Sequence, residues 1–237
     1  WLQVDLLADT RAGEDTAYSL EFAGGAPEPT SPVRIEAGGP VDTPENWQRP
    51  VGVLHLPVTV DTGALRLELP QGGFAPFAHV AVGDRVVSSA AAGEGGFEIT
   101  DARGKVYSSA PAEPEQVIVE SQGPLRATLC VKGKLVGADG AAYMRYLCRM
   151  HFFAGKPYVR TVFCLDNDVA EPDMNLFSAA RVKVPAALSG ASVTYGADEG
   201  PLDLPVGQRL LQDEDNHFTA GQKQGKRAGG WLLAEAQ

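Results

Sequence analysis

Apolar and polar residues alternate along most of this chain, and clusters of Gly, Pro and Asp break the alternation at short intervals. A period of two is typical of strands with one buried face, and no window repeats apolar residues at helical spacing. We therefore expect an all-β protein, a large antiparallel β-sandwich, with less than about 10% helix. The expected strands span residues 2–8, 16–22, 51–60, 64–69, 78–82, 97–100, 116–121, 125–136, 142–153, 158–166, 178–184, 192–195 and 230–234.

The stretch 23–50 interrupts this pattern. It carries six prolines, several glycines and little alternation, which is typical of an extended linker or a long surface loop. We therefore expect two parts: residues 1–45, with the tail of a preceding β domain and the linker, and residues 46–237, with the main domain. The chain begins at Trp1 and its last residues resemble a strand cut short, so we expect a piece of a longer protein.

Composition narrows the classes of function. The chain has 237 residues, 44% of them hydrophobic and 21% charged, which is enough to bury a core. No run approaches the ~20 apolar residues of a membrane span. With 20 basic and 30 acidic side chains the formal charge is −10, and an acidic chain is a poor candidate for binding nucleic acid. We therefore expect neither a membrane nor a nucleic acid as partner.

One stretch departs from this acidic average. Residues 125–160 hold seven Lys and Arg and one Asp, so the local balance is +6 and the rest of a chain of −10 carries −16. Residues i and i+2 of a strand share a face, so the expected strand 142–153 has one apolar face and one polar face. The polar face carries Tyr143, Arg145, Leu147, Arg149, His151 and Phe153.

The same parity places further polar residues on this face if consecutive strands pair as hairpins. They are Lys132, Tyr158 and Arg160. The planar fork of arginine matches carboxylates, and tyrosine offers a stacking surface for sugar rings, so an acidic oligosaccharide or polysaccharide fits such a face. Two alternatives stay open: the face packs against another domain or the acidic remainder of the chain, or it is merely solvated.

The other chemistry-bearing residues offer weaker signals. The three cysteines, Cys130, Cys148 and Cys164, are odd in number and lack zinc-ligand spacing, so we expect three free thiols. The acidic stretch 212–218, with His217, offers the oxygen ligands that calcium prefers, but its spacing matches no known calcium loop. We therefore expect no metal and no other cofactor, with calcium at this stretch as the alternative.

Several runs of residues resemble one family. They are VESQGPLRA at 119–127, VKG at 131–133, YLCRMHFFAGKPYVR at 146–160, DTGALR at 61–66 and GKRAGGW at 225–231. Together they resemble the central domain of the exo-acting rhamnogalacturonan lyase-like family. The resemblance implies an N-terminal β-barrel, whose end would lie within residues 1–45, a central β-sandwich within 46–237, and a C-terminal helical toroid of the same protein as partner.

The resemblance also implies a reaction, β-elimination on an acidic, uronic-acid-containing polysaccharide of plant type. A cation must neutralise the uronate carboxylate, and a base must take the proton on the neighbouring carbon. Arg145, Arg149 and Arg160 are candidates for the first role, His151 for the second, and Tyr143 or Tyr158 for the acid, with Lys132 as a further substrate contact. The alternative is a non-catalytic β-sandwich that binds carbohydrate or braces a catalytic domain.

Overall fold

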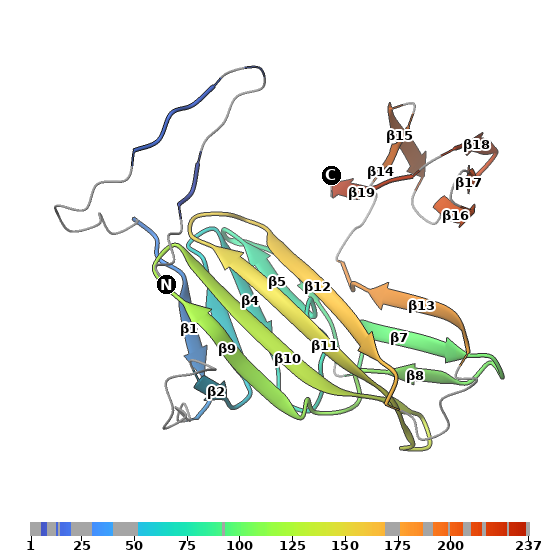
Figure 1. Ribbon diagram of the computed structural model, residues 1–237, viewed down its shortest axis with the longest axis horizontal. Coiled ribbons are helices and arrows are strands. Elements are labelled where there is room, and N and C mark those ends of the chain that lie inside the picture. Colours follow the sequence, from blue (N-terminus) through green and yellow to red (C-terminus); the bar gives the residue numbers. More distant parts are fainter. Residues whose placement is uncertain are drawn as a thin grey trace. The chain divides into compact units, whose positions relative to one another are not determined.

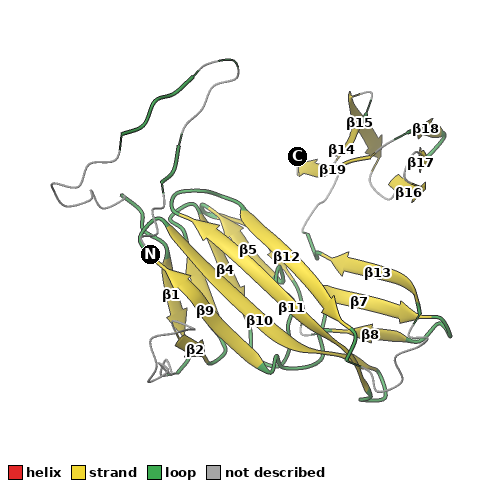
Figure 2. Ribbon diagram, in the orientation of Figure 1, coloured by secondary structure: helices red, strands yellow, loops and turns green. Residues whose placement is uncertain are grey.

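The protein is described by a computed structural model that covers residues 6–8, 13, 15–19, 30–39, 52–91, 93–168, 176–186, 192–198, 200–205, 210–214, 217–226 and 228–235. Its contacts divide the chain into two compact units, Trp1–Pro185 and Ala186–Gln237. None of the described residues is helical (Figure 2), which confirms the expected all-β class. In the same residues, no helix is long and apolar enough to cross a membrane.

The first unit contains a five-stranded antiparallel sheet. Its strands follow the order β1-β3-β4-β5-β6. They are β1 (Arg34–Ala37), β3 (Val58–Asp61), β4 (Leu65–Leu69), β5 (His79–Val82) and β6 (Arg85–Ser89). The alternation along β3 and β4 puts Val58, Val60 and Leu67 on a fully buried face, because every second side chain of a strand points the same way.

An eight-stranded antiparallel sheet forms the second layer of this unit. Its main path runs β12-β11-β10-β8-β7-β13, and β9 joins β10 to β2. The strands are β2 (Gly52–Leu54), β7 (Gly96–Asp101), β8 (Val106–Ser108), β9 (Gln116–Gln122), β10 (Arg126–Gly137), β11 (Ala142–Phe153), β12 (Val159–Asp166) and β13 (Phe177–Lys183). The long ribbons of β9 to β12 lie side by side in Figure 1.

The two sheets share one core, which confirms the sandwich. Side chains such as Leu129 and Val131 of β10 and Met150 and Phe152 of β11 are fully buried in the same cluster as Leu67 of β4. Complete burial of such a side chain contributes roughly 1.5–3 kcal/mol. These residues are the apolar face that strand parity predicts.

Aromatic residues bring distant strands of the larger sheet together. Phe97 of β7 stacks on Phe163 of β12 with ring centroids 3.6 Å apart, although β8, β10 and β11 separate these strands in the sheet order. Phe74 stacks on Tyr146 at 5.4 Å and lies 6.0 Å from Phe97. The larger sheet must therefore curl, because strands four places apart in a flat sheet could not touch.

The second unit holds two three-stranded antiparallel sheets, in the orders β15-β14-β19 and β16-β17-β18. The strands are β14 (Ser192–Ala197), β15 (Gly200–Pro205), β16 (Leu210–Glu214), β17 (His217–Ala220), β18 (Lys223–Gly225) and β19 (Ala228–Glu235). A small core of Leu202, Leu204, Phe218 and Ala220 packs between them.

Some expected strands need correction. The stretch 51–60 forms two strands, because Pro57 has no N–H to donate to a ladder and ends the run between β2 and β3. Strand β1 lies inside the stretch expected to be a linker, and the short strands β6, β8 and β15 to β18 were not expected. Of the first two expected strands, residues 6–8 and 16–19 are not in strands.

The expected division at residues 45 and 46 stays a prediction. Residues 1–5, 20–29 and 40–51 lie outside the described part of the chain, and they include most of the supposed barrel end and linker.

Candidate functional site

Side chains of β9 to β12 that point away from the five-stranded sheet form a surface that we call the outer face. The strand register orders it in rows across the sheet. His151 lies opposite Thr128 on one side and Arg160 on the other, and Arg149 lies opposite Cys130 and Val162. Arg145 lies opposite Lys134 and Asp166. The register thus brings the basic residues onto one face, as strand parity predicts.

Carboxylates share this face with the basic residues. The Arg149 guanidinium donates to Glu120, with Nε 2.8 Å from Oε2 and Nη2 3.0 Å from Oε1. Arg145 Nε lies 2.9 Å from Asp168 and its Nη2 lies 3.4 Å from Glu115, while Lys134 Nζ lies 3.5 Å from Asp168. The cationic residues predicted from the sequence are therefore partly neutralised by their neighbours.

The neutralisation leaves a small excess of positive charge on the face. Six bases lie on or beside the outer face, and four acids offset them, which leaves +2. The bases are Arg126, Lys132, Lys134, Arg145, Arg149 and Arg160, and the acids are Glu115, Glu120, Asp166 and Asp168. Among the described residues, no ion pair is formed by Lys132 or Arg160.

The pair of Arg149 and Glu120 controls the electrostatics of the middle of the face. The hydrogen bond from Arg149 lowers the pKa of Glu120, although partial burial opposes the shift, and the same bond raises the pKa of Arg149. Burial, followed by the nearby Glu120 carboxylate, raises the pKa of Cys130 to about 11. Cys130 is therefore a neutral thiol at neutral pH.

His151 is half-buried, and its Nδ1 lies 3.0 Å from Thr128 Oγ1. Burial lowers the pKa of His151 below its ordinary value, and the positive charges of Arg160 and Arg126 lower it further. The imidazole is consequently neutral at neutral pH, the state in which it accepts a proton.

An aromatic pair adjoins His151 and Arg160. Phe153 and Tyr158 lie with ring centroids 5.7 Å apart, and Tyr158 is 52% exposed. These two residues flank the loop between β11 and β12, so we call His151, Phe153, Tyr158 and Arg160 the hairpin-end patch. The patch combines a neutral imidazole, an exposed guanidinium and an exposed aromatic surface.

Thr62, in the turn between β3 and β4 of the five-stranded sheet, fixes this loop. Its hydroxyl donates to the carbonyl of Lys156 at 2.9 Å, and the N–H of Gly155 donates to the carbonyl of Thr62 at 2.7 Å. Thr62 is fully buried, whereas Lys156 is half-buried and Gly155 is exposed, so these bonds are shielded from water on the Thr62 side. The loop that places Tyr158 beside Arg160 is thus tied to the opposite layer of the sandwich.

Two predicted site residues lie elsewhere on the face. Tyr143 stacks on Tyr107 at 4.4 Å and packs against the core. It is eight residues from His151 along β11, or about 26 Å, so the structure does not bring the two together. Lys132 lies two rows from His151 and, with Arg145, lines a separate hollow.

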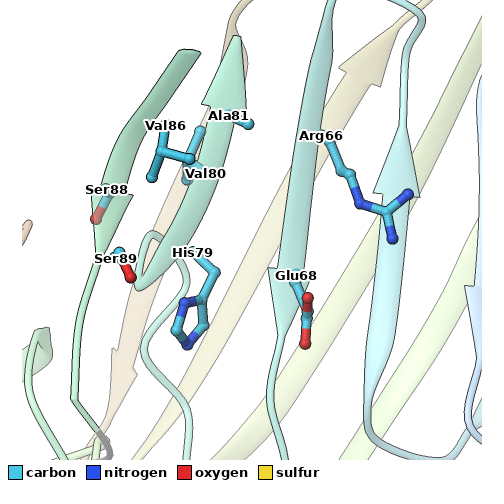
Figure 3. A pocket seen from close by; sticks show the side chains of 8 residues that line it. All are labelled: Arg66, Glu68, His79, Val80, Ala81, Val86, Ser88 and Ser89. Atoms are coloured by element: carbon cyan, nitrogen blue, oxygen red, sulfur yellow. The ribbon is translucent and has the colours of Figure 1, made fainter. Parts of the chain in front are cut away.

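A smaller hollow of about 200 Å³ lies on the exposed side of the five-stranded sheet (Figure 3). Arg66 and Glu68 of β4 and His79 of β5 border it, and none of its eight lining residues is Phe, Tyr or Trp. It therefore lacks the aromatic surface that a sugar ring prefers, and we assign it no role.

The described residues contain no group of three or more His, Cys, Asp or Glu that could hold a metal ion. Asp215 and Asn216 lie outside them, and so do the side chains of residues 211–214. The calcium alternative at the acidic stretch 212–218 thus stays a prediction.

The comparison with known families decides the relationship. The chain matches the PcRGLX-like protein central beta sandwich domain over residues 54–189, which is more than half of its length. This chain belongs to that family. The match confirms the resemblance to exo-rhamnogalacturonan lyase-like proteins, and no curated protein matches the chain. In this PcRGLX-like sandwich the matched range contains the hairpin-end patch and all the paired bases of the outer face.

Sequence reasoning missed the acidic partners of this PcRGLX-like sandwich. Glu120 lies on the expected strand 116–121, where parity alone would have placed it on the face of Gln116 and Ile118. That face is the outer one, because Ile118 pairs with Cys130. Glu115 and Asp168 fall just beyond strand ends, where parity carries no information.

Proposed function

We propose that the protein acts on a uronic-acid-containing polysaccharide by β-elimination, and that the hairpin-end patch holds a uronate unit of that substrate. One observation carries the proposal. Arg160, a cation without a described ion-pair partner, lies directly opposite a neutral His151 and next to the aromatic pair of Phe153 and Tyr158. Membership of a rhamnogalacturonan lyase-related family supports the substrate class.

Each group of the patch has a chemical role. The Arg160 fork binds the uronate carboxylate and offsets the negative charge that builds up when the neighbouring carbon loses its proton. Neutral His151 accepts that proton. The electrons of the broken C–H bond form a carbon–carbon double bond, and the bond to the glycosidic oxygen breaks. Tyr158 is the candidate acid that returns a proton to this oxygen.

Arg145 and Arg149 take a different part in this proposal. Their guanidiniums are already bound to carboxylates of the outer face, so a substrate carboxylate would have to displace Glu120, Glu115 or Asp168. We assign them the positioning of the face. Tyr143 has no part, because it lies at the far end of β11.

Variants of the patch test the proposal. Release of unsaturated product from a galacturonate-containing polysaccharide is followed by ultraviolet absorbance. His151→Ala should lower the rate by about 10²–10⁴-fold, the usual worth of a general base. Arg160→Ala should lower it by about ten- to a hundredfold, the loss of one charge-assisted contact.

Arg66→Ala, on the opposite sheet, is the matched control and should keep full activity. Normal rates in both patch variants would rule out the patch as the site of reaction.

A second function rests on the paired bases. A face whose arginines already bind their own carboxylates, and whose Thr128 and Cys130 are buried, also suits a non-catalytic sandwich that braces a catalytic domain or only binds carbohydrate. If the outer face only braces a catalytic domain, His151→Ala and Arg160→Ala should lower the thermal stability of the protein. The remaining activity should then follow the fraction of folded protein.

A further inference from the structure

Strand β12 ends the larger sheet with an edge that the described strands leave unpaired. Within the described part of the chain it pairs only with β11, and Figure 1 shows it at the margin of the long ribbons β9 to β12. An unpaired strand edge presents a row of backbone N–H and C=O groups that a further strand can bind. Such an edge needs either protection or a partner.

The other edge strands of the first unit carry features that usually prevent such pairing. Strands β1 and β2 have only four and three residues. The register shifts in the pairs of β5 with β6 and of β7 with β13, and β13 also carries Arg181 and Lys183. Strand β12 has eight residues, no proline and an unbroken register with β11. It is therefore the edge of this unit best suited to adding a strand.

The inner side of β12 is incompletely covered. Val159, Phe163 and Leu165 pack against the core, but each stays half-buried. In the neighbouring β11, Met150 and Phe152 are fully buried. A strand placed beyond β12 would cover the remaining apolar surface of this row, and the burial of such surface favours association.

The outer side of β12 carries a charge pattern that is complementary to itself. Arg160 and Asp166 lie near opposite ends of the strand, and both are exposed. Neither forms an ion pair with another described residue. Both lie equally far along the chain from Phe163. In an antiparallel pair of two β12 strands centred on Phe163, Arg160 of each copy therefore faces Asp166 of the other, as opposite charges across a strand pair should.

We propose that two copies of this chain associate through their β12 strands, paired antiparallel about Phe163, with two reciprocal ion pairs between Arg160 and Asp166. Residues that lie opposite each other share a face, so the outer faces of the two copies form one continuous surface. Each copy contributes a single strand, so the interface is small and the dimer is reversible.

Sedimentation velocity over a series of concentrations tests the association itself. The wild-type chain should show an equilibrium between monomer and dimer. A chain that stays monomeric at about 1 mM, a concentration at which even weak pairing is populated, would overturn the proposal.

An exchange of charges at the two ends tests the register. Arg160→Asp and Asp166→Arg each put like charges at both ends of the pair, so the dissociation constant of either variant alone should rise roughly tenfold or more. An equal mixture of the two variants should regain the wild-type affinity, because the two acidic positions of one variant face the two basic positions of the other. Single variants that dimerise like the wild type, or a mixture that does not dimerise, would overturn the pairing. Thermal denaturation shows that each variant is folded.

Val162→Cys tests the same register by a covalent link. Val162 lies opposite the partner's Cys164 in the proposed pair, and residues opposite each other on antiparallel strands have Cα atoms roughly 4.5–5.5 Å apart, a distance that a disulfide spans. Mild oxidation should therefore give a linked dimer on a non-reducing gel. The wild-type chain should give none, because its two exposed thiols lie on a diagonal, with Cα atoms about 7–8 Å apart.

Val86→Cys is the matched control. Val86 is 59% exposed and lies on β6, the edge strand of the other sheet, so its thiol is accessible but has no place in the proposed pair. It should behave like the wild type. No linked dimer from Val162→Cys, or as much from Val86→Cys, would overturn the pairing.

Digalacturonate separates the dimer from the proposed function. Arg160 also belongs to the hairpin-end patch, so a bound uronate and the partner's Asp166 compete for its guanidinium. Saturating digalacturonate should therefore shift the wild-type chain severalfold towards monomer, a result that rests on the proposed function. If digalacturonate binds and the dimer persists, while the exchanged charges behave as expected, the dimer stands and the uronate assignment of Arg160 is wrong. If binding needs Arg160 but the chain never dimerises, the dimer is wrong and the patch stands.

Discussion

Arg149 binds Glu120 across an intervening strand. The guanidinium on β11 and the carboxylate on β9 form a fork, with Nε–Oε2 at 2.8 Å and Nη2–Oε1 at 3.0 Å, while β10 lies between them. Cys130 occupies the β10 position beside Arg149 and is fully buried although it belongs to the outer face. The ion pair thus links β9 to β11 across β10, beside the Cys130 thiol.

A double-mutant cycle should detect this tie. Both side chains are partly exposed, 40% for Arg149 and 33% for Glu120, so solvent screens the pair. Arg149→Met and Glu120→Gln should each lower the free energy of unfolding by about 1 kcal/mol. The double variant should lose less than the sum, as measured by urea denaturation. Strictly additive losses would show that the fork does not couple the strands.

His151 should titrate below its ordinary pKa of 6.5. Burial and the charge of Arg160 disfavour the imidazolium in the folded protein, so the unfolded chain binds the proton more readily. The contribution of His151 to the free energy of unfolding is therefore fully present above pH 6.5. It is lost as the pH falls from 6.5 towards the lower pKa of His151 in the folded chain.

Nuclear magnetic resonance of the His151 ring should give the lowered midpoint, and Arg160→Ala should move it up. A midpoint at or above 6.5 in the wild-type chain would contradict the burial argument.

All three thiols should be free but unequal. Burial raises the pKa of Cys130 to about 11 and that of Cys148 to about 12, whereas Cys164 is exposed. An alkylating reagent should modify one thiol in the native chain and three in denaturant. A disulfide, visible as two unreactive thiols in denaturant, would require a different strand register.

Gly133 is required by Tyr146. A Cβ at Gly133 would lie 2.5 Å from the Tyr146 hydroxyl, and that ring is 2% exposed and stacked on Phe74. Gly133→Ala should therefore cost about 1–3 kcal/mol of unfolding free energy through overpacking.

The Tyr146 hydroxyl itself is buried and makes no hydrogen bond within the described residues, so Tyr146→Phe should cost little. In that background Gly133→Ala should be less harmful. An equal cost in both backgrounds would place the clash on the ring carbons, of which Cζ would lie 2.7 Å from the new Cβ, rather than on the hydroxyl.

Strand parity predicted the long strands of this sandwich well because their inner faces are uniformly apolar. In β11, Met144, Tyr146 and Cys148 alternate with half-buried or exposed residues, and their burial follows that pattern. Short strands such as β8 carry only three residues, too few for a period to show. Pro57 divides a stretch that the sequence pattern predicts as one continuous strand. An apolar run alone does not show where the inter-strand hydrogen bonds are interrupted.

The site was predictable only in part. Parity along one strand placed Arg145, Arg149 and His151 on one face, but pairing between strands decides which charges meet. Glu120 reaches Arg149 over β10, a contact that depends on the order of β9, β10 and β11. Tyr143 shows that residues of the same parity need not lie close together. It shares the parity of His151, yet its distance along β11 and its stacking on Tyr107 separate it from the patch.

One titration tests the central claim most directly: the pKa of His151 in the chain with and without saturating digalacturonate. A uronate carboxylate bound to Arg160 would offset the guanidinium charge and add negative charge beside the imidazole, so the pKa of His151 should rise on binding. The rise should disappear in Arg160→Ala. An unchanged His151 pKa in the presence of bound digalacturonate would contradict the assignment of the hairpin-end patch as the uronate site.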